Sequence, residues 1–381
     1  MKILLIGEYS RLHNSLKEGL ESYGHEVVLF GTRDGFKGYP VDENFKGVLF
    51  EKGFLNFITK VVYRLFKINF LSLEQGLKFY ARLKKYGDFD VVQLINEMSI
   101  ETTPKFEIYL LKKVFLKSKK TFLLSCGTDY ISVSYANDKK FRYSILTPYF
   151  EGIAEKDKVY SAIFRYLSKS NKKIHAFLYQ YIDGVIASDL DYHIPLIGNK
   201  KYLGLIPNPI NTDILEFNKL VITDKIIIFH GVNIENYHKK GNYLFDKALD
   251  IIIEKYSDKV DVIRTENIPY VTYIEKYNTC HILLDQVYAF DQGYNALEAM
   301  AKGKVVFTGA EKEFLEYYHL ENNQVCINAL PSVDSLVDEL EHLILNPSLI
   351  PKIGLSARKF IEENHSYKEI AKKYLAVWSS N

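Results

Sequence analysis

Short apolar runs rich in Val, Ile and Leu recur along the chain, separated by longer stretches in which apolar positions have helical spacing. Strands buried on both faces read as such runs, and the helices that cover a parallel sheet lie between them. The runs fall at 3–6, 26–30, 90–95, 121–125, 184–188 and 203–207 in the first half, and at 225–229, 259–264, 281–285, 304–308 and 324–327 in the second. The pattern predicts an α/β protein with two Rossmann-like, doubly wound domains that face each other.

The alternation breaks in a segment that contains Pro207 and Pro209, followed by turn-forming Asn and Asp. Proline restricts the backbone, and Asn and Asp favour turns. We therefore place an interdomain hinge here and predict an N-terminal domain over 1–207 and a C-terminal domain over 208–364.

Apolar positions at helical spacing continue from about 355 to 378, after the last predicted strand. A helix at this place can close the second domain or cross back to the first. We assign 365–381 to this C-terminal helix and leave both arrangements open.

The charge balance excludes some classes of protein. With 49 basic and 47 acidic residues the formal net charge is +2, which is not typical of a dedicated nucleic-acid binder.

Three widely spaced cysteines predict a reducing compartment and no structural zinc. No uncharged apolar run approaches the roughly 20 residues that span a bilayer, and the apolar N-terminus is too short for a signal peptide. We expect a cytoplasmic protein.

The most informative segment reads Gly293-Tyr294-Asn295-Ala296-Leu297-Glu298-Ala299-Met300-Ala301-Lys302-Gly303-Lys304-Val305-Val306. A glycine opens a helical run that ends at a C-capping glycine and returns into an apolar strand. Ligands of open α/β sheets bind at the carboxyl ends of the strands, and a helix N-terminus there suits a diphosphate. We expect Gly293, Tyr294 and Asn295 at such a site, with Glu298 accepting hydrogen bonds from ribose hydroxyls. The alternative is an amphipathic helix with a solvated Glu.

A second constellation follows the first predicted strand of the second half, as His230-Gly231-Val232-Asn233 and then His238-Lys239-Lys240-Gly241. Glycine lets a backbone approach a ligand closely, and a lysine in a strand-to-helix loop can place its charge on a phosphate. We select Gly231, Asn233, Lys239 and above all Lys240, which directly precedes a glycine. The alternative is a solvated turn lysine.

Together these segments carry a resemblance. The stretch from Glu298 to Val306, with Gly293 upstream, resembles the donor-site signature of the retaining family-4 glycosyltransferases (glycosyl transferases group 1), which have the GT-B fold. Lys240-Gly241, the hinge prolines and Gly24-His25-Glu26-Val27 support it. The resemblance implies transfer of a sugar from a nucleoside diphosphate sugar, with Glu298 and Lys240 as catalytic residues, no bound metal and no further cofactor.

The signature departs from the family at one position. Members have two glutamates, of which the first meets the donor sugar and the second the ribose, and Phe290 stands where the first is expected. Because Phe cannot hydrogen-bond a sugar hydroxyl, Asp291 can substitute for it, or Asp285 and Gln286 can supply the polar contacts from the strand end. An inactive site is the third possibility. The family's arginine is also replaced, by Val232, and Lys239 or Arg264 can supply its charge.

Polar residues also follow the strands of the first domain. The loop Gly7-Glu8-Tyr9, with His13 behind it, resembles the acceptor-side loop of these enzymes but is short in glycine. At other strand ends Glu97 and Asp129 are candidates to orient or deprotonate an acceptor hydroxyl, with helix-cap or turn roles as the alternative. The Asp-x-Asp sequences at 88–90 and 189–191 are interpreted as turn residues away from the diphosphate.

A basic, aromatic segment runs from Lys52 to Lys85, with eight basic residues against one acid, Glu74. Its apolar stretch over 54–67 has regularly spaced cations, as a helix on an anionic membrane surface has. The alternative is an ordinary helix that covers the domain with a solvated basic face. RNA binding is disfavoured because no nucleic-acid motif accompanies the patch.

These observations lead to one functional expectation. The chain resembles a glycosyltransferase for a glycan or lipid-linked acceptor in cell-surface polysaccharide or glycoconjugate synthesis, with a peripheral position at the inner face of the plasma membrane. The alternatives are another GT-B enzyme of nucleotide sugars, such as an epimerase, and a catalytically degenerate module that binds glycans or nucleotides.

Overall fold

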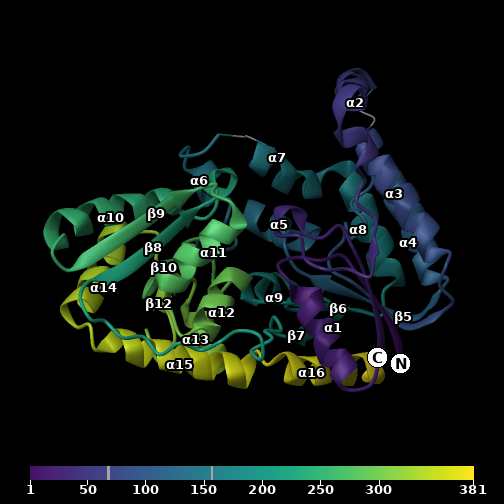
Figure 1. Ribbon diagram of the computed structural model, residues 1–381. Coiled ribbons are helices and arrows are strands. Elements are labelled where there is room, and N and C mark those ends of the chain that lie inside the picture. The colour runs from purple at the N-terminus through teal and green to yellow at the C-terminus, as the bar shows by residue number, and fades with distance from the viewer. Residues whose placement is uncertain (67–68, 156–157) are drawn as a thin grey trace.

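The computed structural model describes residues 1–66, 69–155 and 158–381, and it contains two parallel β-sheets, each covered by helices (Figure 1). The last strand of the first sheet ends at Leu205, and the first strand of the second begins at Ile226. The predicted α/β class is therefore confirmed. The hinge segment lies in the connection between the sheets.

Within the described residues the first sheet has seven strands in the order β3-β2-β1-β4-β5-β6-β7. Its bounds are β1 (Lys2–Ile6), β2 (Glu26–Gly31), β3 (Glu43–Asn44), β4 (Phe89–Leu94), β5 (Ser118–Ser125), β6 (Gly184–Ala187) and β7 (Tyr202–Leu205). All pairings are parallel, and the chain winds outward from β1 in both directions. Every predicted strand of this half is present. The two-residue β3 was not predicted because it carries no apolar run.

Two apolar clusters cover the two faces of this sheet, one built on Leu4 and Ile6 and the other on Ile3 and Leu5. The alternation follows from the strand geometry, in which successive side chains point to opposite faces. The helices of this half are α1 (Leu12–Ser22), α2 (Gly53–Phe66), α3 (Phe70–Leu83), α4 (Pro104–Phe115), α5 (Tyr130–Asn137), α6 (Thr147–Phe150), α7 (Lys158–Phe164), α8 (Lys169–Tyr181) and α9 (Leu190–Leu196).

The second sheet has the order β12-β11-β10-β8-β9 and is again parallel. Its strands are β8 (Ile226–Val232), β9 (Val260–Glu266), β10 (Ile282–Leu284), β11 (Val305–Thr308) and β12 (Ile327–Asn328). Its helices are α10 (Asn242–Tyr256), α11 (Tyr270–Thr279), α12 (Tyr294–Ala301), α13 (Lys312–Tyr318), α14 (Val333–Leu345) and α15 (Leu349–Asn364). The carboxyl ends of β8 and β10 face the first domain, which positions the loops that follow them.

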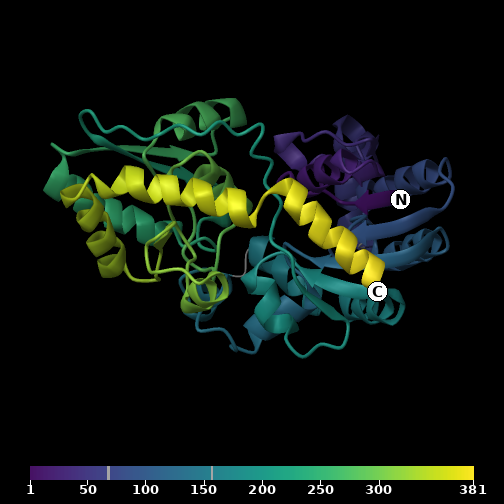
Figure 2. The same cartoon turned by 90° about the horizontal axis from the view of Figure 1, so that it is seen from below.

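The C-terminal segment differs from the single helix that its periodicity predicts. It forms two helices, α15 and α16 (Tyr367–Ser380), and the break at His365 and Ser366 pairs with Ile210 of the connecting segment. Figure 2 shows α15 beneath the second sheet and α16 continuing beneath the first. There α16 packs on α1, with the backbone of Tyr367 against Gly19. The crossing to the first domain is therefore the arrangement that the chain adopts.

Candidate functional site

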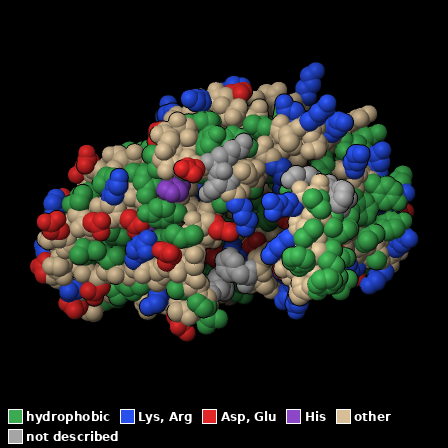
Figure 3. All heavy atoms as spheres, turned by 90° about the horizontal axis from the view of Figure 1, so that it is seen from above, with side chains coloured by type: hydrophobic (Ala, Val, Ile, Leu, Met, Phe, Trp, Pro, Cys, Tyr) green, Lys and Arg blue, Asp and Glu red, His purple; other side chains and the backbone are tan. Residues whose placement is uncertain are grey.

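A cleft of about 1210 Å³ lies between the two domains and receives side chains from both. It is lined by Gly231, Asn233, Lys239, Lys240, Asp285, Gln286, Asp291, Gly293, Tyr294 and Asn295, all of which were expected from the sequence. Figure 3 shows the hollow between the two halves of the molecule. Loops far apart in the sequence thus meet, because parallel strands deliver their following residues to the same edge.

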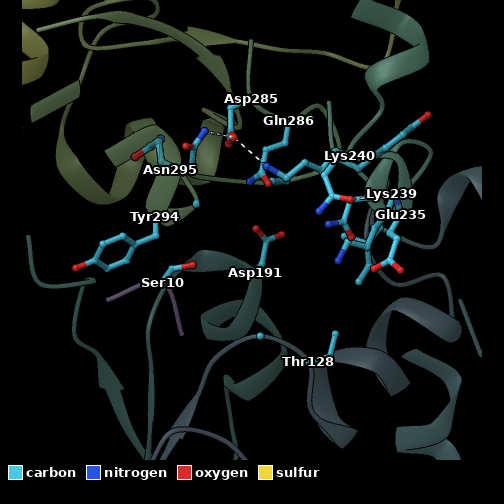
Figure 4. A pocket seen from close by; sticks show the side chains of 18 of the residues that line it. Ser10, Thr128, Asp191, Glu235, Lys239, Lys240, Asp285, Gln286, Tyr294 and Asn295 are labelled. Carbon is cyan, nitrogen blue, oxygen red and sulfur yellow. Dashed lines mark hydrogen bonds and ion pairs between the residues drawn. The ribbon is translucent and has the colours of Figure 1, made fainter. Parts of the chain in front are cut away.

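The helix α12 points its first turn into this cleft (Figure 4). Its N-cap is Gly293, which offers no side chain, and its first internal bond joins the Leu297 N–H to the Gly293 carbonyl. The earlier N–H groups of the turn therefore have no intrahelical acceptor. If a Cβ were placed on Gly293, the nearest protein atoms would be those of the Gln286 side-chain amide, 3.6 Å away. This distance leaves room for a ligand against the backbone.

Lys240 stands beside this helix start (Figure 4). Its ammonium lies 2.9 Å from Oδ1 of Asp285, and the side-chain amide of Asn295 donates to the same oxygen at 3.0 Å. Asp285 is buried while Lys240 is about one-third exposed in the cleft. Gly241, with φ of 75° and a Cβ position 2.7 Å from Val287, turns the chain so that Lys240 reaches this place. The ion pair between Lys240 and Asp285 holds the ammonium group next to the N–H groups of α12 that have no intrahelical acceptor.

Of the two residues that can supply a second positive charge, one lies in the cleft. Lys239 lines it, and burial together with the neighbouring Lys240 lowers its amine pKa to about 8. Arg264 is on β9, where its guanidinium pairs with Asp246 at 2.7 Å and with Glu266 at 3.4 Å. The structure therefore favours Lys239 as the second cation.

Glu298 lies one turn further along α12, partly buried, beyond the residues that line the cleft. Burial raises its carboxyl pKa to about 7, against the opposing charges of Lys37, Lys302 and Arg11. Lys37 and Arg11 belong to the first domain, so Glu298 faces the domain interface. Lys37 itself lines the cleft and donates to the hydroxyl of Ser10 at 2.7 Å.

Phe290 is 2% exposed and covered by a segment of the first domain. Its ring packs on Phe141 and Tyr143, with ring centroids 5.1 and 5.6 Å away, and the Arg142 guanidinium lies 4.7 Å above it. Arg142 also pairs with Glu311 and Glu313 of the second domain. The position at which the resemblance expects a sugar-binding carboxylate is thus an apolar contact between the domains.

The acceptor-side residues of the first domain are mostly engaged inside it. Gly7 has φ of 92°, and a Cβ there would lie 2.1 Å from Ile95, so packing requires the glycine. Glu8 accepts from the backbone and side chain of Asn14, and burial raises its pKa to about 7. His13 contacts the Gly7 carbonyl at 2.7 Å, and burial lowers its pKa to about 4. Tyr9 packs against the core on this face.

Glu97 and Asp129 are both buried and hydrogen-bonded. Glu97 lies 2.6 Å from His175 Nδ1 and accepts the Tyr130 N–H, and burial raises its pKa. Asp129 caps α5 in a reciprocal arrangement with Ser132. The structure thus places both residues behind the cleft, with contacts typical of a structural carboxylate.

The interpretation of Asp189 and Asp191 as turn residues away from the site is wrong. Both line the cleft, and their carboxylate oxygens lie within 4.8 Å of those of Asp291 from the other domain. The Leu190 N–H donates to Asp291 at 2.9 Å, and the Phe290 N–H donates to Asp191 at 3.2 Å. Carboxylate oxygens are ligands for hard cations, and these three lie close enough together to share one.

The sequence also missed cleft residues that no local motif marks. From the first domain the cleft receives Ser10, Asp34, Lys37, Thr128, Ser132 and Asp191, among others. Asp90, by contrast, is the second residue of β4 and accepts the Lys2 N–H at 2.8 Å, at the amino ends of the strands and away from the cleft. The two Asp-x-Asp sequences look alike, and only their places in the sheet distinguish them.

Comparison with known proteins supports the resemblance to GT-B glycosyltransferases. Residues 235–376 match the family model described as glycosyl transferase-like. None of the curated proteins matches the chain in sequence. Among solved structures, sucrose-phosphate synthase from Thermosynechococcus elongatus superimposes with a TM-score of 0.63 at 13% identity, covering 100% of this chain and 98% of that one. The fold is GT-B.

Two further GT-B structures are similar over the whole chain. HepE of Anabaena, in complex with UDP and glucose, has a TM-score of 0.58 at 13% identity and covers 100% of both chains. A putative UDP-N-acetylglucosamine 2-epimerase from Listeria monocytogenes has a TM-score of 0.52 at 12% identity, covering 99% of this chain and 95% of that one. The family match and the GT-B fold together support a glycosyltransferase.

The basic, aromatic segment forms α2 and α3 (Figure 1), and its residue Lys67 lies outside the described residues. None of the side chains described in α2 is buried, and Phe54, Phe57 and Leu65 are 74, 63 and 68% exposed. Figure 3 shows green and blue side chains together on this half. Among the helices that the structure describes, none has the length and apolar character needed to cross a bilayer.

Proposed function

We propose that the protein transfers a sugar from a nucleoside diphosphate sugar to a hydroxyl group of a glycan or lipid-linked acceptor. One observation carries the proposal. Lys240 and the side-chain amide of Asn295, in the first turn of α12, contact the same oxygen of Asp285, which places the ammonium charge and the free N–H groups of that turn at one end of the cleft. Such a pair suits a diphosphate, the leaving group of this reaction.

This reaction does not require a covalent bond between the protein and the sugar. The bond between the anomeric carbon and the diphosphate oxygen breaks with its electron pair going to the diphosphate, whose added negative charge Lys240, Lys239 and the α12 N-terminus stabilise. The acceptor hydroxyl arrives from the first domain, forms the new bond to the anomeric carbon and gives its proton to the departing diphosphate. Retention of the anomeric configuration follows from the family resemblance. HepE was crystallised with UDP and glucose, which supports a uridine nucleotide as the first donor to test.

The experiment that tests the proposal is calorimetry with UDP, GDP, ADP and CDP, followed by turnover assays with the corresponding sugars. Transfer to an added acceptor supports a glycosyltransferase. Epimerisation of the free donor favours the second GT-B activity suggested by the Listeria structure. Binding without turnover identifies a degenerate module, and no affinity for any nucleoside diphosphate refutes the donor site.

Glu298→Ala is expected to lower kcat/KM by at least ~10-fold, because we assign its carboxylate to the ribose hydroxyls. Steady-state kinetics with the donor chosen by calorimetry checks this. Glu254→Ala, at an exposed position of α10, is the matched control and keeps wild-type activity. Near-normal turnover of the Glu298 variant would contradict its role.

The same residue gives a pH-dependent prediction. Its pKa is raised to about 7 from 4.5, so the folded state favours the protonated form, and stability is lost as the pH rises through this window. Glu298→Gln, which cannot ionise, is therefore expected to raise Tm relative to the wild type at pH 8 and to leave it nearly unchanged at pH 4. A larger gain at pH 4 than at pH 8 would reverse the sign and refute the burial argument.

We further propose that α2 rests on an anionic membrane, which would bring a lipid-linked acceptor to the first domain. Lys52, Lys60 and Arg64 are exposed beside its apolar side chains, and no acid interrupts the helix. The basic residues of α3 contribute less, since Lys78 pairs with Glu74 at 2.6 Å and others pair with Glu43. We therefore assign the membrane contact to α2 alone and not to the whole basic segment.

Co-sedimentation with phosphatidylglycerol vesicles measures this contact. Each basic residue near an anionic surface contributes about 1 kcal/mol, so Lys60→Glu with Arg64→Glu is expected to weaken binding by at least ~10-fold. The control pair Lys247→Glu with Lys352→Glu changes the net charge equally on exposed sites of the second domain and keeps wild-type binding. Binding that is equally weak in both pairs, or insensitive to salt, would argue against α2.

A further inference from the structure

The loop that follows β10 has few groups that can recognise a sugar. Beyond the diphosphate end, this loop runs through the buried apolar side chains of Val287, Ala289 and Phe290 and through Tyr288, whose hydroxyl is hydrogen-bonded to that of Tyr243. Gln286 is the neutral polar side chain at the strand end, beside Gly293. A sugar that extends from the diphosphate therefore needs another polar partner.

The second domain lines the cleft with three carboxylates, and each has a protein partner. Glu235 pairs with Lys158 of the first domain at 3.2 Å. Asp285 holds Lys240 and Asn295 through one oxygen. Asp291 is 7% exposed and accepts the Leu190 N–H of the first domain at 2.9 Å. The second oxygen of Asp285, Oδ2, is buried and has no hydrogen-bond partner in the described part of the chain, and the contacts of Oδ1 set its position.

Asp191 approaches the cleft from the other domain. It stands on α9 of the first domain and lines the cleft, and Figure 4 shows its carboxyl group pointing toward the end of the cleft that carries Gln286 and Asn295. In the described part of the chain the Asp191 carboxylate accepts the Phe290 N–H, whose nitrogen lies 3.2 Å from one oxygen and 3.3 Å from the other. The carboxylate thus reaches the backbone of the residue at which the donor signature lacks its glutamate.

We propose that Asp191 is the carboxylate that binds the donor sugar, delivered across the cleft from the first domain in place of a side chain at position 290. This deepens the proposed function and rests on it. Hydroxyl groups of a sugar donate strong, charge-assisted hydrogen bonds to a carboxylate. Burial raises the pKa of Asp191 to about 7, as expected of a carboxyl group with few hydrogen-bond donors, and the sugar supplies the donors that are missing.

The arrangement has a consequence for specificity. In this proposal the second domain supplies the diphosphate contacts, whereas the sugar contact requires both domains. They are held together by Arg142 on Glu311 at 2.5 Å and by Tyr294, whose hydroxyl lies 2.8 Å from that of Ser15. Sugar recognition and domain closure are thereby coupled, and the nucleotide alone does not report on Asp191.

The test compares Asp191→Asn and Asp191→Ala with the wild type. Calorimetry first selects the nucleoside diphosphate that binds best among UDP, GDP, ADP and CDP, and then measures it beside its glucose conjugate. Both variants are expected to lose at least ~10-fold in affinity for the conjugate and in kcat/KM, with less than a twofold change for the nucleoside diphosphate. Asp258→Asn, on an exposed turn, is the matched control and keeps wild-type values.

The pair of variants separates recognition from structure. Asparagine still accepts the Phe290 N–H, so a structural role predicts a normal Asp191→Asn and a defective Asp191→Ala, and that result would overturn the proposal. Equal losses for the nucleotide and its conjugate would overturn it too, because they indicate a distorted cleft. If the wild type binds no nucleoside diphosphate, the donor site fails and this inference fails with it.

Discussion

Lys240→Ala is expected to lower kcat/KM for the nucleotide sugar on the order of 100-fold, as the loss of one preorganised contact to a developing anion does. The reason is geometric, since this ammonium lies beside the open first turn of α12 and is fixed there by Asp285 at 2.9 Å. Steady-state kinetics with the donor chosen by calorimetry measures the effect. Lys247→Ala, on the exposed side of α10, is the matched control.

The same substitution also leaves Asp285 buried without its cation, which costs about 3 kcal/mol of stability. The double variant Lys240→Ala with Asp285→Asn removes both charges and keeps an acceptor for Asn295. It is expected to regain most of the stability, measured by chemical unfolding, while activity stays low. Recovery of activity together with stability would show that Lys240 acts through the fold alone.

Trp378→Ala is expected to destabilise the protein by about 3–5 kcal/mol, as large-to-small changes in a core do. Trp378 is the single tryptophan of the chain, is 1% exposed, and packs on Phe122 of the first sheet and on Tyr374 of its own helix. It anchors α16, which extends from the second domain onto the first. Chemical unfolding followed by circular dichroism measures the loss, because fluorescence would lose its probe.

Two variants bracket this prediction. Lys373→Ala, on the exposed side of α16, is expected to change stability by no more than about 0.5 kcal/mol. Trp378→Phe keeps an aromatic ring against Phe122 and is expected to cost less than the alanine variant. A loss below about 1 kcal/mol in Trp378→Ala would mean that α16 contributes little to holding the first domain.

The cleft residues of the second domain could be predicted because their signals are local in the sequence. A glycine before a helical run specifies an open helix start, and Lys240 before Gly241 specifies a turn that presents an ammonium. Both features depend on a few adjacent residues, so the sequence contains them in full. The carboxyl ends of β8 and β10 then bring the two segments together, as parallel sheets require.

The acceptor half could not be predicted in the same way. Asp90 and Asp191 each close an Asp-x-Asp sequence, yet one lies near the amino end of a central strand and the other in the cleft. Glu97 and Asp129 follow strands as catalytic carboxylates do, yet one is bonded to His175 and the other caps a helix. Their surroundings come from distant segments, which a local pattern does not contain.

By itself, the sequence determined the alternation of strands and helices, the two parallel sheets and the open helix start that lies at the cleft. The physical reason is that backbone geometry and the period of apolar residues act over a few positions. Tertiary structure alone decided that α16 crosses to the first domain, that Phe290 is covered by Phe141 and Tyr143, and that Asp191 reaches the cleft. Those outcomes depend on how the two domains pack against each other, and packing joins residues that are far apart in the chain.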